Sequence, residues 1–221
     1  MGLRSELRLC RLAAVLLVCA AVLLPMAGCQ SIAFTVAYLF NGLDDPPECN
    51  KLKEKRVVVV CRQVASLQYV NGRVDQELAE HVAALLKKNV SGIKLVEPRK
   101  VNEWMDENET GEQGFTEVGK AFKADMVLGI ELERFSLLDN QTLYQGKASA
   151  TVKVYDCKTG EVVFRKSRQT LYPPHFPIQT SEMPERIFRE RFIEVLADQL
   201  GRYFYAHDSN ADIGLGNEAI N

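Results

Sequence analysis

The residues Val57–Cys61 (VVVVC) form an unbroken run of β-branched side chains closed by a cysteine. β-Branched residues favour strands, and a strand without polar alternation is typical of one that is buried on both faces. The chain around it has 221 residues, of which 47% are apolar and 25% are charged. Such a length and composition indicate about one ordinary globular domain and not a disordered chain. The run therefore predicts a buried strand inside a folded domain.

Hydrophobic periodicity predicts the other elements of this domain. An apolar stripe of helical spacing predicts a helix over Val74–Val90, and Pro98 opens a second helix that runs to about Glu107. A third, short helix is expected over Phe115–Phe122, and a last helix begins at Pro184 and runs to about Tyr205. Strands are expected at 57–61, 93–96, 126–133, 147–154 and 161–166, the last pair joined by a tight turn at Lys158-Thr159-Gly160.

The element order β-α-β-α-α-β-β-β-α predicts a single α+β domain. We expect a mixed sheet in which the last three strands form an antiparallel meander, with the helices mainly on one face. The domain is expected over residues 51–206, after a linker that is rich in turn residues and followed by a polar tail over 207–221.

The N-terminus has the pattern of a secretory signal. Three arginines in Met1–Arg11 precede the apolar run Leu12–Leu24, which is too short to span a bilayer, since that needs about 20 residues. Small residues follow, ending in Ala27-Gly28-Cys29. This segment resembles the lipobox of bacterial lipoproteins, with Met26 at the position where leucine is commonest. The resemblance implies cleavage after Gly28, lipidation of Cys29 and acylation of the new amine, so that 1–28 is a signal peptide and 29–50 a lipidated tether.

Two other interpretations of the N-terminus stay open. The segment could be an ordinary cleaved signal peptide in which the cysteine is coincidental. Alternatively, Leu12–Leu24 and the apolar segment Ile32–Phe40 could together form one longer membrane anchor, although Pro25, Gln30 and Ser31 interrupt it. If Cys29 is lipidated, Gln30 favours the outer membrane, because aspartate at this position often signals retention in the inner membrane. The partner is then the membrane itself, through the lipid.

Three segments of the domain resemble a family of periplasmic lipoproteins. They are LVEPRKVNEWMDE (95–107), KADMVLGIELERF (123–135) and VKVYDCKTGEVV (152–163). In this order they resemble the curli-secretion lipoproteins, and related folds in the N-terminal domain of the Tol–Pal periplasmic protein and in lipoprotein activators of penicillin-binding proteins. The resemblance covers about Lys55 to Tyr205. It implies a periplasmic α+β domain that serves envelope assembly and protein contacts.

The sequence departs from the curli-secretion pattern where those channels insert long strands into the outer membrane. The matching connection Asn108–Gly114 is short, and the one at about Arg168–Glu182 contains Pro173, Pro174 and Pro177. Prolines cannot donate hydrogen bonds to a barrel ladder. We therefore expect that this chain keeps the soluble domain without the pore.

Signals for chemistry are weak. No metal-binding, phosphate-binding or hydrolase motif occurs, and a net charge of −2 argues against binding of nucleic acid. Glu131 and Glu133 share one side of a strand and are expected on a solvated sheet face. Three cysteines remain after the signal, namely Cys49, Cys61 and Cys157. They lack metal-site spacing, and one disulfide with one free thiol is possible without a choice of pair. His81 is expected as a structural histidine at the edge of a helix stripe. No cofactor or metal is expected.

The segment Leu171–Ile178 (LYPPHFPI) is the candidate for binding another protein. Tyr172, His175 and Phe176 stand among three prolines, and rigid aromatic residues make good interface anchors. The alternative is that Tyr172 and Phe176 fold back and cap the sheet. Trp104 is expected in the core.

Two functions from different classes remain. The first is a lipid-anchored, non-enzymatic periplasmic adaptor or assembly factor of the cell envelope that acts by contact with another envelope protein. The second is an envelope hydrolase or thiol-redox enzyme whose site has no recognised motif. A deep pocket with convergent carboxylates or histidines would favour the enzyme, whereas a flat sheet or groove beside an exposed aromatic loop would favour the adaptor.

Overall fold

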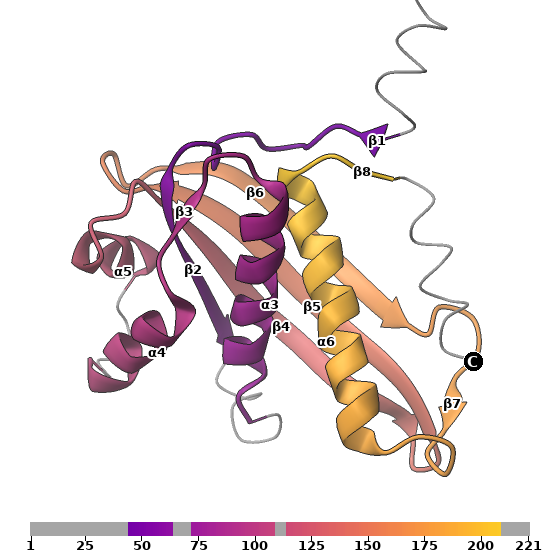
Figure 1. Ribbon diagram of the computed structural model, residues 1–221. Coiled ribbons are helices and arrows are strands. Elements are labelled where there is room, and N and C mark those ends of the chain that lie inside the picture. Colours follow the sequence, from indigo (N-terminus) through magenta and orange to yellow (C-terminus); the bar gives the residue numbers. More distant parts are fainter. Residues whose placement is uncertain (1–43, 64–71, 109–113, 209–221) are drawn as a thin grey trace, which may run out of the picture. The chain divides into compact units, whose positions relative to one another are not determined.

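The computed structural model describes residues 44–63, 72–108 and 114–208 (Figure 1). By its internal contacts the chain divides into two units, Met1–Asp44 and Asp45–Asn221, and the fold described below belongs to the second. The predicted signal sequence, with cleavage after Gly28 and lipidation of Cys29, lies outside the described residues. Within those residues, no helix combines the length and the apolar character that crossing a membrane requires.

The strands form one mixed sheet in the order β3-β2-β4-β5-β6, with the short strand β7 paired to β5. Their bounds are β2 Arg56–Gln63, β3 Lys94–Leu95, β4 Met126–Asn140, β5 Leu143–Asp156, β6 Val162–Tyr172 and β7 Ile178–Gln179. β2 is parallel to β3 and β4, whereas β4, β5 and β6 are antiparallel to their neighbours. This confirms the predicted mixed sheet and its three-strand meander. Two further strands, β1 (Asp44–Asp45) and β8 (His207–Asp208), pair with each other.

The helices occupy both faces of the sheet (Figure 1). They are α3 (Val74–Asn89), α4 (Pro98–Glu107), α5 (Phe115–Ala121) and α6 (Glu185–Gly201), which continues into the 3₁₀ turn η1 (Arg202–Phe204). The two long helices, α3 and α6, pack on one face and enclose the larger core. The short helices α4 and α5 cover the other face only at β2 and the beginning of β4. The α+β class is confirmed. The long helices lie on one face of the sheet, as expected, whereas the short helices lie on the other.

The valine run lies in β2, between β3 and β4, where both faces are covered. Val57, Val59 and Cys61 face the core under α3 and α6. Val58 and Val60 face the smaller core under α4 and α5. All five side chains are at most 5% exposed. Alternate side chains of a strand point to opposite faces, so an unbroken apolar run is what a strand between two cores requires.

Stacked aromatic rings fill the larger core where α6 crosses β4 and β5. The Tyr144 and Phe188 rings lie 4.7 Å apart between centroids, and those of Phe135 and Phe192 lie 5.2 Å apart. Gly146 of β5 lies directly under Phe192, and a Cβ there would come within 2.6 Å of the ring. Only glycine therefore permits this close approach of helix and sheet.

The folded domain begins before residue 51. Cys49 is 5% exposed, Leu52 is fully buried, and both belong to the larger core. The Cys49 amide donates to the carbonyl of Tyr203 over 2.9 Å. The residues just before Lys51, which the sequence places in a linker, therefore form part of the packed structure.

Candidate interaction surfaces

The proline-rich segment forms a loop between β6 and β7 that is fixed at both ends. β6 ends at Tyr172, and β7 pairs with β5 through Ile178 and Tyr144. The Gln145 side-chain amide donates to the carbonyl of Pro173 over 3.3 Å. These contacts hold the loop between the end of the long meander and the start of α6.

The structure separates the three residues that were predicted to contact a partner. Phe176 is 82% exposed, and His175 is also exposed. Tyr172 is only 5% exposed, because its ring lies against Phe188 and Phe192 with centroids 5.9 Å and 6.4 Å away. The assignment of Tyr172 to a binding surface is therefore wrong, and the alternative that it folds back on the sheet is right for Tyr172 alone.

The loop lies far from the place where the chain joins the domain. Glu48 binds Lys166 of β6, with Nζ 2.7 Å from Oε2. From Lys166 the strand continues for six residues to Tyr172, which at about 3.3 Å a residue is roughly 20 Å. Phe176 lies beyond that point, at the end of the sheet where Figure 1 shows β7. The exposed ring of Phe176 thus lies beyond the opposite end of β6 from the Glu48–Lys166 ion pair.

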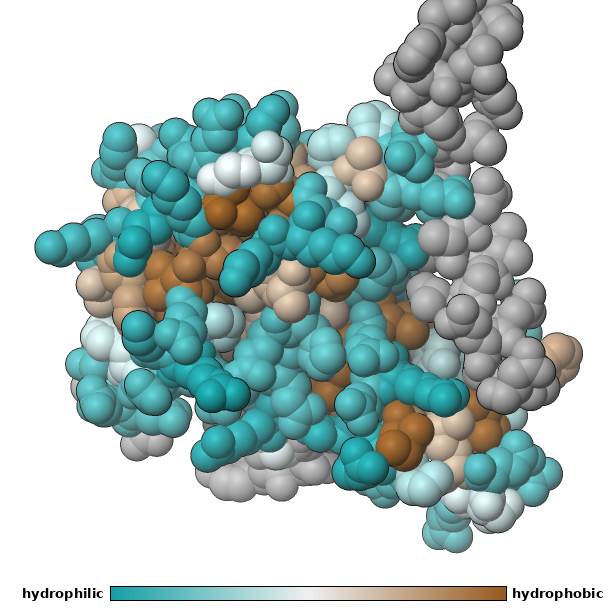
Figure 2. Space-filling model, viewed as in Figure 1, coloured by the Kyte–Doolittle hydropathy of each residue, from teal (hydrophilic) through white to brown (hydrophobic). Residues whose placement is uncertain are grey.

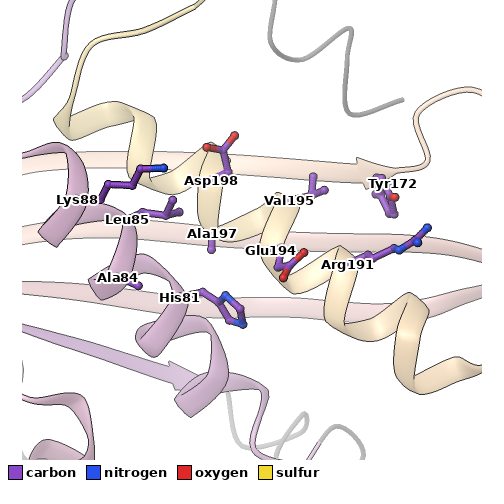
Figure 3. A pocket seen from close by; sticks show the side chains of 10 residues that line it. All are labelled: His81, Ala84, Leu85, Lys88, Tyr172, Arg191, Glu194, Val195, Ala197 and Asp198. Atoms are coloured by element: carbon purple, nitrogen blue, oxygen red, sulfur yellow. The ribbon is translucent and has the colours of Figure 1, made fainter. Parts of the chain in front are cut away.

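A cavity of about 520 Å³ lies along α6, mainly in the groove between α6 and α3 (Figure 3). Four lining residues come from α3, five come from α6, and Tyr172 lies on the other flank of α6. The titratable residues of this groove are His81, Lys88, Arg191, Glu194 and Asp198. Positive and negative groups are mixed there, and the outer faces of both helices are largely hydrophilic (Figure 2). His81 is half-exposed at the edge of its helix stripe, as the sequence indicated.

The half-buried carboxylate of Asp198 in this groove already has partners. An oxygen of Asp198 lies 2.6 Å from the guanidinium of Arg202, and the Tyr205 hydroxyl donates to the other oxygen over 3.3 Å. Burial, together with the charge of Asp198, raises the pKa of Tyr205 to about 12. This cluster ties the C-terminal end of α6 to the turn that follows, so we assign it a structural role and not an acid–base one.

The carboxylates of β4 lie on the open face of the meander, where each binds side chains of β5. Lys153 binds Glu131 with both oxygens 2.6 Å from Nζ. Glu133 accepts hydrogen bonds from the hydroxyls of Thr151 at 2.6 Å and Ser149 at 3.1 Å. The predicted solvated sheet face is therefore present, and these acids are not aimed into a cavity.

Cys49, Cys61 and Cys157 are free thiols. Cys61 lies in the larger core under α3, whereas Cys157 packs against the smaller core under α4 and α5. Burial raises the pKa of all three thiols, most strongly for Cys61. Within the described ranges, no three His, Cys, Asp or Glu side chains gather where they could hold a metal ion.

The domain is similar to solved structures of bacterial proteins, some of which are lipoproteins. One is lipoprotein GNA1162 from Neisseria meningitidis, with 13% identity and a TM-score of 0.43 over 66% of this chain and 96% of that one. Another is the PelC dodecamer from Paraburkholderia phytofirmans, with 14% identity and a TM-score of 0.44 over 73% and 94%. The LpoB C-terminal domain from Salmonella enterica has 14% identity and a TM-score of 0.36 over 53% and 83%.

No protein-family model and no curated protein matches the sequence. Identities and TM-scores as low as those of the solved structures do not carry a function from one protein to another. The function proposed below is argued from the residues of this chain.

Proposed function

We propose that this protein is a lipid-anchored, non-enzymatic periplasmic adaptor or assembly factor of the bacterial cell envelope, which binds another envelope protein. The lipobox-like segment ending at Cys29 supports the anchor, and Gln30 supports the outer membrane as its location. Several acyl chains at one cysteine give stable attachment, because each buried methylene contributes about 0.8 kcal/mol. Residues 29 onward then connect the lipid to the folded domain.

The exposed ring of Phe176 is the observation that carries this proposal. A phenylalanine with 82% of its surface in water is unfavourable for an isolated domain, and burying its ring is worth roughly 2 kcal/mol. The loop is fixed at both ends and carries Pro173, Pro174 and Pro177, so little conformational entropy is lost on binding. These are the properties of an interface anchor.

The position of the loop fits a tethered protein. Glu48 and Cys49 mark where the chain joins the domain, and Phe176 lies at the other end of β6. A tether at one end leaves the other end free to meet a partner. Tethering also raises the effective concentration of the domain near partners in the same compartment.

Photo-crosslinking in intact cells tests the proposal directly. The full chain carries p-benzoylphenylalanine in place of Phe176, and a matched chain carries it in place of Arg99, an exposed residue of α4, which packs on β2 and not on β6. We expect a discrete adduct with an envelope protein from position 176 and none of the same mass from position 99. Adding Cys29→Ala should reduce that adduct severalfold. The absence of an adduct from position 176, or the same adducts from both positions, would refute the proposal.

The alternative of an envelope hydrolase or thiol-redox enzyme has no observation in its favour among the described residues. The carboxylates of β4 bind Lys153 and hydroxyls, Asp198 is held by Arg202, and Cys61 and Cys157 lie on opposite sides of the sheet. A hydrolase or redox pair needs such groups to converge on a substrate.

A further inference from the structure

β6 is the outermost strand of the meander and has a partner on one side only. It pairs with β5 from Val162 to Tyr172, and in the described part of the chain no strand lies on its other side. In an antiparallel pair, every second residue of an edge strand turns its N–H and C=O outward. Over the length of β6 this leaves a row of backbone donors and acceptors that an additional strand can bind.

The charge of β6 is entirely positive. Arg165, Lys166 and Arg168 are its charged residues, and the strand contains no acidic side chain. Lys166 binds Glu48, and the Arg168 side chain donates to Gln199, both on the helix side of the sheet. Arg165 is on the opposite, open face, where its neighbour across the ladder is Lys153. Lys153 already binds Glu131, and Glu133 accepts hydrogen bonds from Thr151 and Ser149, so both carboxylates of β4 contact side chains other than Arg165.

This charge disfavours pairing of β6 with a second copy of itself. Two antiparallel copies overlap completely only when the pairing is centred on Ser167, the middle of the strand. In that register Lys166 of each copy lies opposite Arg168 of the other copy, so the pairing contains two pairs of like charges. Like charges directly opposite each other destabilise a strand pair, and basic residues on edge strands are a common protection against self-association.

We infer that the free edge of β6 binds an extended, acidic segment of the partner protein, which adds to the sheet as a further strand. The inference rests on the proposed function, because it assumes that the domain binds a protein. Backbone hydrogen bonds would supply the affinity common to all strand additions, and alternate side chains would supply the specificity. β6 leads directly into the loop with Phe176, so one partner segment can contact both.

The side chains on the open face of β6 define the expected ligand. Alternation from Arg165 places Ser167, Gln169 and Leu171 on this face, and beyond the register shift at Val163 the residue opposite Tyr155 of β5 is Val162. Val162 is 44% exposed and Leu171 is 43% exposed, so exposed apolar groups stand near both ends. A complementary segment therefore carries apolar residues at its ends, an acidic residue that meets Arg165, and neutral polar residues between.

Peptide selection tests the inference. The domain, as the soluble mature chain with Cys29→Ser, is used to select from a displayed library of random twelve-residue peptides, and the best peptide is synthesised. We expect acidic, proline-free sequences. Arg165→Glu should weaken binding of that peptide about five- to tenfold, because an opposite-charge cross-strand pair becomes a like-charge pair. Arg99→Glu, at an exposed arginine of α4, is the matched control and should leave binding unchanged.

A second measurement reports strand addition itself. Two versions of the selected peptide are N-methylated at alternate amides, one at even positions and the other at odd positions. One version should lose at least tenfold in affinity and the other should bind nearly normally, because only alternate N–H groups of an added strand face β6. Equal effects of both versions, no effect of Arg165→Glu, the selection of no acidic peptide, or equal competition by vesicles of anionic lipid would each overturn the inference.

The two experiments separate the two proposals. An adduct from position 176 together with failed peptide tests would leave the proposed function standing and remove β6 as the site. Peptide binding that obeys both tests, with no adduct from position 176, would keep β6 as a strand-binding edge and refute the proposed function, which is argued from Phe176.

Discussion

The ring of Tyr172 lies against the ring of Phe188, with centroids 5.9 Å apart and planes tilted by 31°. Four residues further along the same proline-rich segment, Phe176 leaves 82% of its surface exposed. One aromatic residue thus anchors the end of β6 to helix α6, and the other is presented to the surroundings. The two side chains are chemically similar, so substituting each in turn separates stability from binding.

Tyr172→Ala should destabilise the domain, whereas Phe176→Ala should not. Removal of a buried aromatic ring typically costs about 3–5 kcal/mol, because its contacts are lost and a cavity remains. Removal of an exposed side chain usually changes stability by about 0.5 kcal/mol or less. Urea denaturation followed by circular dichroism measures both. Equal stabilities of the two variants would contradict the packing described here.

The different positions of these two residues show where sequence reasoning was sufficient and where it was not. The order of the longer strands and helices was predictable, because β2 is a continuous apolar run and α3 and α6 carry apolar residues at helical spacing. The proline spacing, however, suggested that Tyr172 and Phe176 were equivalent. The alternation of β6 distinguishes the two residues. Phe164 faces the larger core, so the other even-numbered residues of the strand, including Thr170 and Tyr172, are expected on the same face.

The lengths of the meander strands were also underestimated. β4 extends to Asn140 and β5 begins at Leu143, although the alternation of apolar and polar residues in the sequence is lost after Glu133. The ladder continues through register shifts between Leu132 and Asn140, and each shift breaks the period of two by which a strand is recognised. The charged groove between α3 and α6 was not predicted, because its residues look like an ordinary solvated helix face in sequence.

Cys29→Ala should abolish lipid attachment. The basic, apolar and small segments before Cys29 match a lipoprotein signal, and the thioether can form only at a cysteine thiol. Metabolic labelling with a fatty acid should mark the wild-type chain and leave the variant unlabelled and unprocessed or soluble. Cys49→Ala should keep its label, since that thiol is buried in the folded domain. Normal labelling of Cys29→Ala would rule out the anchor.

The residues just before Lys51 should contribute measurably to stability. A fragment over 45–208 keeps buried Cys49, its hydrogen bond to Tyr203 and the ion pair between Glu48 and Lys166, whereas a fragment over 51–208 loses all three. We expect the shorter fragment to be less stable by about 2–3 kcal/mol, mainly through the loss of a buried side chain and a backbone hydrogen bond. Thermal unfolding of both fragments makes the comparison, and identical midpoints would show that the domain begins at Lys51.

The three thiols of the domain should react with iodoacetamide in a fixed order. Burial raises the pKa of each thiol, and the thiolate is the reactive form, so all three react slowly near neutral pH. Cys157 is partly exposed and should react first, while Cys61 is shielded on all sides and should react last. Mass spectrometry of the alkylated chain over time gives the order. Rapid labelling of Cys61 in the folded domain would contradict its place under α3.

Tyr205→Phe should make the domain less sensitive to alkaline pH. Burial and the neighbouring charge of Asp198 raise the pKa of Tyr205 to about 12 in the folded chain, whereas an unperturbed phenol has a pKa of 10.0. Between these values the folded chain keeps the proton and the unfolded chain loses it, so stability falls as pH rises above about 10. Phenylalanine cannot ionise, and the variant should lose this part of the slope while giving up the hydrogen bond to Asp198. Urea denaturation between pH 8 and about 11 measures both slopes, and a variant as alkali-sensitive as the wild type would show that Tyr205 does not titrate in this way.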